Sequence, residues 1–227
     1  MPPAPREALD DDMPGAPAVH GVLHHATAPS GDALVLTHGA GSNREAPMLV
    51  ALADALASRG VSVLRCDLPF RQARSTGPPS SRDGAADRAG LRHAVHALRA
   101  RVTGRIALGG HSYGGRQASV LAAEETGLVT ALLLLSYPLH PPSRPTQMRT
   151  AHFPALHTPT MFVQGSKDLF GSRDDLRAAI TTIAAPVTIL ELDGAGHALR
   201  LSAATEIADA FLRWWRPAGR RATESLA

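Results

Sequence analysis

Cysteine is nearly absent from this 227-residue sequence: Cys66 is the only one, so no disulfide can form within the chain. Disulfides are a feature of secreted proteins, and a lone cysteine fits a reducing compartment. Residues 1–17 have no basic start followed by an apolar core, so they do not match a signal peptide. No apolar run approaches the roughly 18 residues that a membrane helix needs. We therefore expect a cytoplasmic protein that is not attached to a membrane.

Lysine is also rare, because Lys167 is the only one and the other 22 of the 23 basic residues are arginines. The 20 acidic residues almost balance them, and the net charge is +3. The densest run of arginines, within 88–105, has the spacing of the solvent side of an amphipathic helix. A protein that binds nucleic acid would gather its basic residues on one face, so no nucleic-acid partner is expected.

Short apolar runs alternate with amphipathic stretches along the chain, and this alternation predicts a doubly wound α/β fold. The runs are apolar at consecutive residues, as in the strands of a mostly parallel sheet that helices cover on both faces. The expected core strands are 33–37, 61–65, 105–109, 130–136, 160–164 and 187–192. The expected helices are 45–59, 87–101, 117–125, 173–183 and 202–215. Residues 19–27 are expected to add antiparallel edge strands.

The length of the chain and its hydrophobic content of 44% suit one domain with one sizeable core. We place this domain at residues 18–216. Residues 1–17, which are rich in proline, alanine and aspartate, are interpreted as a flexible tail. Residues 217–227 are interpreted as a second flexible tail.

The segment Gly110-His111-Ser112-Tyr113-Gly114 matches the pattern G-x-S-x-G. The pattern alone is weak evidence, but an expected strand leads into it and an expected helix follows it. Glycine at positions 110 and 114 lets neighbouring backbone pass close to the turn. This context predicts that Ser112 is a nucleophile on a sharp strand–turn–helix connection, with His111 in a supporting role.

A serine hydroxyl needs a base, and the base needs an acid that orients it. Asp168 and His197 each follow a predicted strand, at the sheet edge where the sites of open α/β sheets gather. Their order along the chain, Ser112, then Asp168, then His197, is the order that this type of site requires. We predict Asp168 as the acid and His197 as the base, with Asp193 and Asp174 as alternative acids.

The turn after the first core strand, His38-Gly39-Ala40-Gly41, has the composition of an oxyanion loop. Gly39 and Gly41 permit a tight turn that aims a backbone amide at the site. The amides of Ala40 and Tyr113 are the predicted oxyanion donors. His38 is expected to brace the turn by hydrogen bonds.

The remaining histidines and the cysteine are expected to be structural. The pairs His24 and His25, and His93 and His96, have no cluster of acidic or cysteine residues beside them. Metal sites need such clusters, so neither a metal nor another cofactor is expected. Cys66 is expected to pack in the core.

Two loops are expected to form the walls of the site. The link Tyr137–Pro159 is rich in proline and has no long helical pattern, which predicts that a large helical lid is absent. The loop Pro69–Gly84 is the other expected wall. The proline-rich link also contains His140, His152 and His157. The sequence does not decide whether these histidines are exposed to solvent or line the pocket.

Several segments resemble the α/β-hydrolase superfamily, and in particular its dienelactone-hydrolase-related branch. They are Leu36–Gly41, Leu68–Phe70, Tyr137–Pro142 and Phe162–Gly171. The branch includes a testis-expressed protein and a subunit of the nonspecific-lethal chromatin complex. The resemblance covers about residues 19–215 and implies the α/β-hydrolase fold, with Ser112, Asp168 and His197 as the triad. Dienelactone hydrolases use a cysteine where this chain has Ser112, so their particular chemistry is not expected here.

These patterns predict a serine hydrolase that cleaves a carboxylic ester or thioester through an acyl-enzyme on Ser112. Its expected partner is a small-molecule ester or acyl substrate. A catalytically silent binding module on the same fold is one alternative. Acyl transfer or perhydrolysis with the same triad is another. The sequence leaves both a monomer and a homodimer open.

Overall fold

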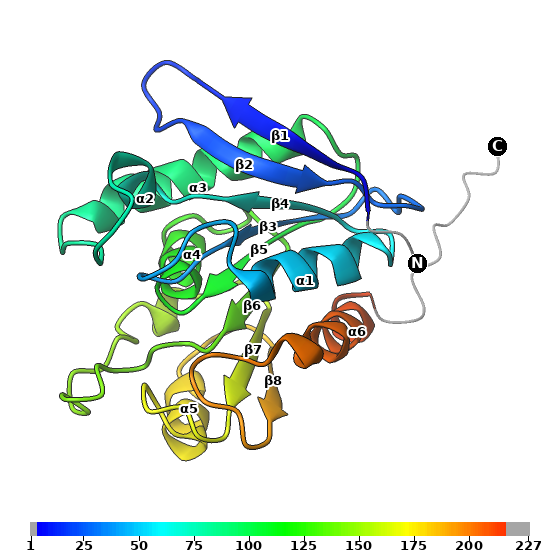
Figure 1. Ribbon diagram of the computed structural model, residues 1–227. Coiled ribbons are helices and arrows are strands. Elements are labelled where there is room, and N and C mark those ends of the chain that lie inside the picture. The colour runs from blue at the N-terminus through cyan, green and yellow to red at the C-terminus, as the bar shows by residue number, and fades with distance from the viewer. Residues whose placement is uncertain (1–3, 217–227) are drawn as a thin grey trace.

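The computed structural model describes residues 4–216, and eight strands form one sheet in this part of the chain (Figure 1). In spatial order they are β1 (Arg6–Asp11), β2 (Val19–His24), β4 (Ser62–Cys66), β3 (Ala33–Thr37), β5 (Ile106–His111), β6 (Ala131–Leu135), β7 (Thr160–Gly165) and β8 (Val187–Leu192). Strands β3 to β8 are parallel, whereas β1 and β2 are antiparallel to their neighbours. The six predicted core strands are confirmed, with ends that differ by at most two residues.

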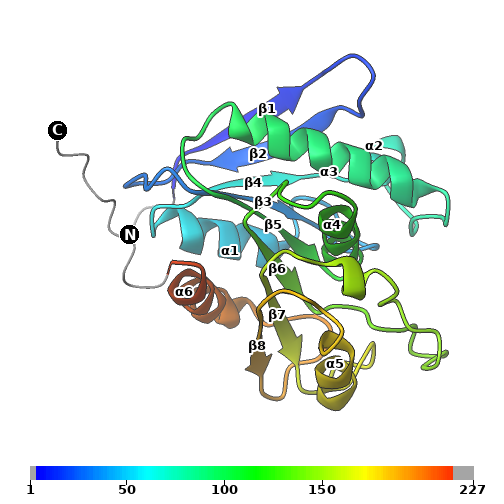
Figure 2. The same cartoon turned by 180° about the vertical axis from the view of Figure 1, so that it is seen from behind.

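Helices cover both faces of the sheet. They are α1 (Pro47–Ala57), α2 (Pro69–Ala73), α3 (Asp83–Arg99), α4 (Tyr113–Glu124), α5 (Arg173–Ile180) and α6 (Ala204–Trp215), with short 3-10 turns at Phe153–Ala155 and Leu201–Ala203. Helices α1 and α6 lie on the face that Figure 1 presents, and α3, α4 and α5 lie on the face seen from behind in Figure 2. The doubly wound α/β architecture is therefore confirmed.

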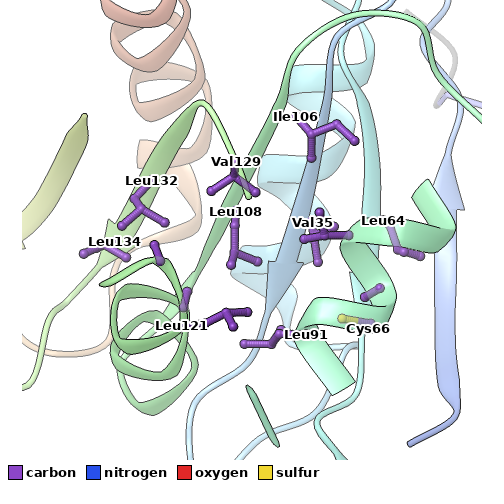
Figure 3. Packing of buried hydrophobic residues seen from close by; sticks show 14 of the residues in the cluster. Val35, Leu64, Cys66, Leu91, Ile106, Leu108, Leu121, Val129, Leu132 and Leu134 are labelled. Carbon is purple, nitrogen blue, oxygen red and sulfur yellow. The ribbon is translucent and has the colours of Figure 1, made fainter. Parts of the chain in front are cut away.

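The core consists of two apolar layers, one on each face of the sheet. In the layer of Figure 3, Val35, Leu108 and Leu134 extend from β3, β5 and β6. Leu91 of α3 and Leu121 of α4 pack against them. The strands are apolar at consecutive residues because both of their faces are buried, as in parallel sheets generally.

The interpretation of residues 1–17 as a flexible tail is wrong for residues 6–11, which form strand β1. Its sequence, Arg-Glu-Ala-Leu-Asp-Asp, has no apolar alternation, because most of its residues face solvent. Pairing with β2 and the buried side chain of Leu9 hold it in place. β2 was expected at an edge, but β1 takes the edge and β2 lies between β1 and β4. The tail predicted at 217–227 lies outside the described residues.

The apolar pattern of the sequence did not predict every helix boundary correctly. Helix α4 begins at Tyr113, directly after Ser112, and not at Gln117 as expected. The apolar pattern did not reveal these first turns because they are rich in glycine. Helix α2, at the start of the predicted loop Pro69–Gly84, was not expected and has proline at its first position. A proline at that position has a backbone φ already suited to a helix.

Parallel strands bring the loops that follow them to one edge of the sheet. The connection between β6 and β7 contains only the 3-10 turn Phe153–Ala155, so a large helical lid is absent from the described chain. Across residues 4–216, no helix combines the length and the apolar character needed to span a bilayer.

Candidate active site

Ser112 lies in a strained turn between β5 and α4. Its φ of 52° and ψ of −115° place a non-glycine residue in a sparsely populated backbone region. The Ser112 amide donates to the Leu135 carbonyl (2.8 Å), and its carbonyl accepts from the Arg116 amide (2.9 Å). Strain that the surrounding structure maintains is common at functional sites, and it separates this serine from an ordinary turn residue.

Glycines make the turn possible. A Cβ at Gly114 would lie 2.4 Å from the His38 carbonyl oxygen, and one at Gly110 would lie 2.8 Å from the Gly114 carbonyl carbon. No side chain fits at either distance. The two glycines therefore let helix α4 start close to β5 and to the turn that follows β3.

The three predicted triad residues lie within hydrogen-bond distance of one another. His197 Nε2 is 2.8 Å from Ser112 Oγ. His197 Nδ1 is 2.9 Å from Asp168 Oδ2 and 3.0 Å from Asp168 Oδ1. Asp168 and His197 come from the loops after β7 and β8, as expected. With Nδ1–H donating to Asp168, Nε2 is free to accept a proton from the serine hydroxyl.

Asp168 is held by further hydrogen bonds beneath the histidine. Its side chain is fully buried and accepts from Gln164 Nε2 (3.0 Å) and from the Phe170 amide (2.9 Å). Of the two alternative acids, Asp193 accepts from a serine hydroxyl in the β7 loop (3.2 Å) and Asp174 lies in the first turn of α5. Neither makes an ion pair with His197 in the described chain, so the geometry favours Asp168.

The ring of His197 is packed between two side chains. Phe170 stacks on it with ring centroids 4.1 Å apart and an interplanar angle of 30°. The His111 ring lies 5.3 Å away, and its Nε2 is 3.0 Å from the His197 carbonyl oxygen. Burial lowers the pKa of His111, so we assign it as neutral with Nε2–H donating. Both contacts restrict the imidazole to the orientation that faces Ser112.

The predicted oxyanion donors both border the pocket above Ser112. Tyr113 is the first residue of α4, so its amide has no acceptor within the helix. The Ala40 amide has no hydrogen-bond acceptor within residues 4–216. A Cβ at Gly39 would lie 2.9 Å from His111 Nδ1, whereas one at Gly41 would meet nothing within 4 Å. Only Gly39 is therefore required for close packing.

His38 braces this turn, in the way that the sequence suggested. The side chain is fully buried, and its Nε2 accepts from the Leu68 amide (3.1 Å). Its Nδ1 therefore holds the proton and donates to the Gly39 carbonyl (2.9 Å). Burial lowers the pKa of His38, which favours this neutral form.

Arg71 also holds the oxyanion turn, and the sequence did not reveal it. Its guanidinium donates to the carbonyls of Ala40 (2.8 Å) and Ser42 (2.8 Å), and to those of Arg74 and Gly77 in the next loop. The side chain is buried although no carboxylate pairs with it in the described chain. The only hint of this role in the sequence was the position of Arg71 beside Pro69 and Phe70, in a segment predicted to form a wall of the site.

A pocket of about 900 Å³ lies over Ser112. Its walls come from the two predicted loops, at residues 78–84 and 147–152. Of the three histidines in the proline-rich link, His152 lines the pocket, His140 is buried and His157 is exposed.

Of the histidine pairs that the sequence offered, His24 and His93 are engaged in structural contacts, whereas His96 is exposed. His24 is buried between Asp54 and Arg65, at 2.9 and 2.7 Å, and His93 contacts the Pro17 carbonyl at 2.9 Å. Within residues 4–216, no group of three or more His, Cys, Asp or Glu side chains is placed to hold a metal ion.

Cys66 packs in the core layer of Figure 3, as predicted. Burial raises the pKa of its thiol to about 12, so it is not a reactive thiolate.

Comparison with known proteins places this geometry in a family context. Residues 30–210 match a family model described as an alpha/beta hydrolase domain. A lidless alpha/beta serine hydrolase from Xanthomonas campestris is 19% identical with a TM-score of 0.75, over 96% of this chain and 100% of that one. A dienelactone hydrolase from Anabaena variabilis is 21% identical with a TM-score of 0.72, and the match covers 93% of this chain and 96% of that one. A serine hydrolase homologue from Coxiella burnetii is 17% identical with a TM-score of 0.73, and the match covers 91% of this chain and 96% of that one. The resemblance to the testis-expressed and chromatin-complex proteins stays a prediction.

Proposed function

The chain belongs to the alpha/beta hydrolase domain family, and on this premise we propose that it hydrolyses a carboxylic ester or thioester with Ser112 as the nucleophile. The observation that supports the proposal most strongly is the continuous chain of contacts from Asp168 through His197 to Ser112, at 2.8 to 3.0 Å. A silent binding module has no need of this alignment or of the strained turn at Ser112.

The steps follow from the positions of the three side chains. His197 Nε2 takes the proton from Ser112 Oγ as the oxygen attacks the carbonyl carbon. Asp168 stabilises the imidazolium that forms and keeps the proton on Nδ1. The protonated His197 then gives its proton to the leaving alcohol or thiol, and an acyl-enzyme remains on Ser112. Water, deprotonated by the same histidine, cleaves the acyl-enzyme and releases the acid.

The negative charge that develops on the carbonyl oxygen in the transition state is stabilised by hydrogen-bond donors that are already in place. We assign this role to the amides of Ala40 and Tyr113, which border the pocket. The N-terminus of α4 adds a favourable dipole at the same position. Donors of this kind contribute roughly 3 kcal/mol each to the stabilisation of a transition state. No cofactor takes part in this mechanism.

Pocket shape favours small or medium acyl groups, because the site is open and no helical lid covers it in the described chain. Long acyl chains need an extended apolar surface, whereas the lining of this pocket includes arginines, serines and three histidines. Both an oxygen ester and a thioester suit the mechanism, since the leaving group receives its proton from His197 in either case.

We test the proposal with 4-nitrophenyl butyrate and a butyryl thioester. The wild type is expected to hydrolyse at least one of them, and Ser112→Ala to lose this activity. Asp168→Asn is expected to lower kcat by roughly 10³- to 10⁴-fold, because the imidazole loses its orienting charge.

Asp174→Asn is the matched control, because it makes the same change at one of the two alternative acids and is expected to leave kcat unchanged. Retention of activity in Ser112→Ala would contradict the mechanism. No turnover by a folded wild type would favour the binding module. Products of transfer to an added alcohol or to peroxide, in place of the free acid, would favour the acyltransferase or perhydrolase alternative.

A further inference from the structure

The pocket beside Ser112 is lined by an excess of positive charge. Arg88, Arg116 and Arg149 border it, and the described lining includes no aspartate or glutamate. The chain as a whole is nearly neutral, with 23 basic and 20 acidic residues. The charge in the pocket is therefore a local feature.

Two of the three arginines have no counter-charge. Arg88 donates to Glu124 at 2.8 Å, which neutralises it. Arg116 and Arg149 make no salt bridge and no side-chain hydrogen bond with any residue in 4–216. By contrast, the buried guanidinium of Arg65 bonds to a histidine, a carbonyl and a carboxylate. Other arginines without a side-chain partner in the described chain, such as Arg144, are exposed, whereas Arg116 and Arg149 are half-buried at the pocket over Ser112.

The backbone of each unpaired arginine is held by hydrogen bonds. Arg116 lies one helical turn beyond Ser112, where its amide donates to the serine carbonyl at 2.9 Å. Its Nε is buried and has no hydrogen-bond acceptor in the described part of the chain. Arg149 is anchored at its backbone, since its amide donates to Leu139 (2.7 Å) and its carbonyl accepts from the Tyr137 hydroxyl (2.8 Å).

The effect of these charges extends to their neighbours. Burial, followed by the charge of Arg116, lowers the pKa of Arg149. Burial, followed by the charges of Arg116 and Arg88, lowers the pKa of His152 to about 4. Both shifts agree with a pocket in which Arg116 and Arg149 have no carboxylate partner within residues 4–216.

Building on the hydrolase function proposed above, we infer that Arg116 and Arg149 form an anion subsite. The substrate is an ester or thioester with a carboxylate or phosphate group a few bonds from the scissile carbonyl. A planar guanidinium matches either anion through paired hydrogen bonds. The anion would supply the acceptor that the buried Nε of Arg116 lacks, and such an unsatisfied group is costly. Residues one helical turn apart have Cβ atoms about 5–6 Å apart, which sets the short distance from the carbonyl to the anion.

The test compares two esters that differ only in charge. Mono-(4-nitrophenyl) adipate carries a free carboxylate, and methyl 4-nitrophenyl adipate has the same chain with that group blocked. We expect the wild type to prefer the anionic ester by roughly tenfold in kcat/KM. The preference is expected to fall several-fold at 0.5 M NaCl, because salt screens partly exposed charges.

Substitutions of single arginines test which residues cause the preference for the anionic ester. Arg116→Met and Arg149→Met are each expected to bring the ratio of the two kcat/KM values close to one. Arg144→Met is the matched control, since Arg144 is exposed in the same loop as Arg149 and does not line the pocket. It is expected to keep the wild-type ratio. If Arg116→Met fails to fold, Arg149→Met and the salt dependence still decide the matter.

Two competitive inhibitors distinguish the chemistry of the anion. Monomethyl adipate presents a carboxylate and monobutyl phosphate a phosphate, and the one with the lower inhibition constant identifies the preferred group. A ratio near one in the wild type, or a ratio that neither arginine variant changes, would overturn the subsite while leaving the hydrolase intact.

The hydrolase and the subsite can fail separately. If neither the adipate esters nor the butyryl substrates are cleaved, the hydrolase proposal fails, and calorimetry with monomethyl adipate and monobutyl phosphate tests the subsite alone. Binding of either anion that weakens about tenfold in Arg149→Met supports the subsite. No binding of either, or binding that the variant does not change, overturns it.

Discussion

At the scale of single residues, the site combines strongly held groups with groups whose charge is suppressed. Asp168 is buried and receives hydrogen bonds from two other groups besides His197. His152, by contrast, is kept neutral, with its pKa lowered to about 4 by burial and by neighbouring arginines. Its Nε2 contacts Ser119 Oγ at 2.8 Å, which suits a neutral ring.

His152 is expected to make stability depend on pH. An unfolded histidine has a pKa near 6.5, so between pH 6.5 and about 4 the unfolded chain takes up a proton that the folded chain refuses. The contribution of His152 is therefore fully present above pH 6.5 and is lost as the pH falls toward 4. This one group adds a slope of up to about 1.4 kcal/mol per pH unit.

Urea unfolding at pH 7.5 and at pH 5 measures this effect. His152→Gln is expected to lose less stability between the two pH values than the wild type does. His157→Gln, a change at an exposed histidine in the same loop, is the control and is expected to behave as the wild type. An equal loss in His152→Gln and the wild type would show that His152 is not the responsible group.

At the scale of elements, the catalytic geometry depends on how loops are joined to one another. Arg71 in α2 donates to the carbonyls of Ala40 and Ser42 in the oxyanion turn. It also donates to those of Arg74 and Gly77, in the loop that leads into the pocket wall at residues 78–84. The other hydrogen bonds of the turn converge on the Gly39 carbonyl, which accepts from His38 Nδ1 and from the Ser42 amide. Arg71 is the group that holds the carbonyls of Ala40 and Ser42 in the described chain, so the shape of this part of the turn depends on it.

Removal of these Arg71 hydrogen bonds is expected to lower kcat more than it raises KM. In Arg71→Met the Ala40 amide is no longer held in place, and we expect kcat for ester hydrolysis to fall by roughly 10- to 100-fold, below the full loss of one oxyanion donor. Arg71→Lys, which restores one or two of the bonds, should recover part of the loss. Arg82→Met, at an exposed arginine nearby, should have no effect. A rise in KM alone, with kcat unchanged, would contradict this positioning role.

Elements differ in how well the sequence predicts them, for physical reasons. Strands such as β3 and β6 are buried on both faces, so their leucines, valines and alanines form consecutive apolar runs. Strand β1 has only Leu9 buried, and backbone pairing rather than an apolar pattern holds it. The first turn of α4 was missed because close packing there demands Gly114 and Gly115, which have poor helix propensity.

At the scale of the whole molecule, the fold brings together residues that are far apart in sequence. Ser112, Asp168 and His197 could be proposed together because each follows a recognisable strand and parallel strands deliver their loops to one edge. The sequence could not predict in this way that Arg116 and Arg149 line the same pocket. Arg149 lies in a proline-rich link with no regular pattern, so its place in the pocket depends on anchoring by Tyr137 and Leu139.

The whole fold also explains why one serine is singled out. The strained turn after β5 and the loops after β7 and β8 bring Ser112 Oγ and His197 Nε2 to 2.8 Å, and the parallel sheet sets the relative positions of these three segments. Activation of Ser112 is therefore expected to be lost on unfolding and to be absent from the other serines of the folded chain.

Labelling with a fluorophosphonate, followed by intact mass, tests this activation directly. We expect one adduct on the wild type, none on Ser112→Ala, and labelling slowed by roughly 100-fold or more in His197→Ala, because the general base is gone. Ser143→Ala, at an exposed serine outside the pocket, should label as the wild type does. An adduct that persists in Ser112→Ala, or a folded wild type that does not react, would contradict the assignment of Ser112 as an activated nucleophile.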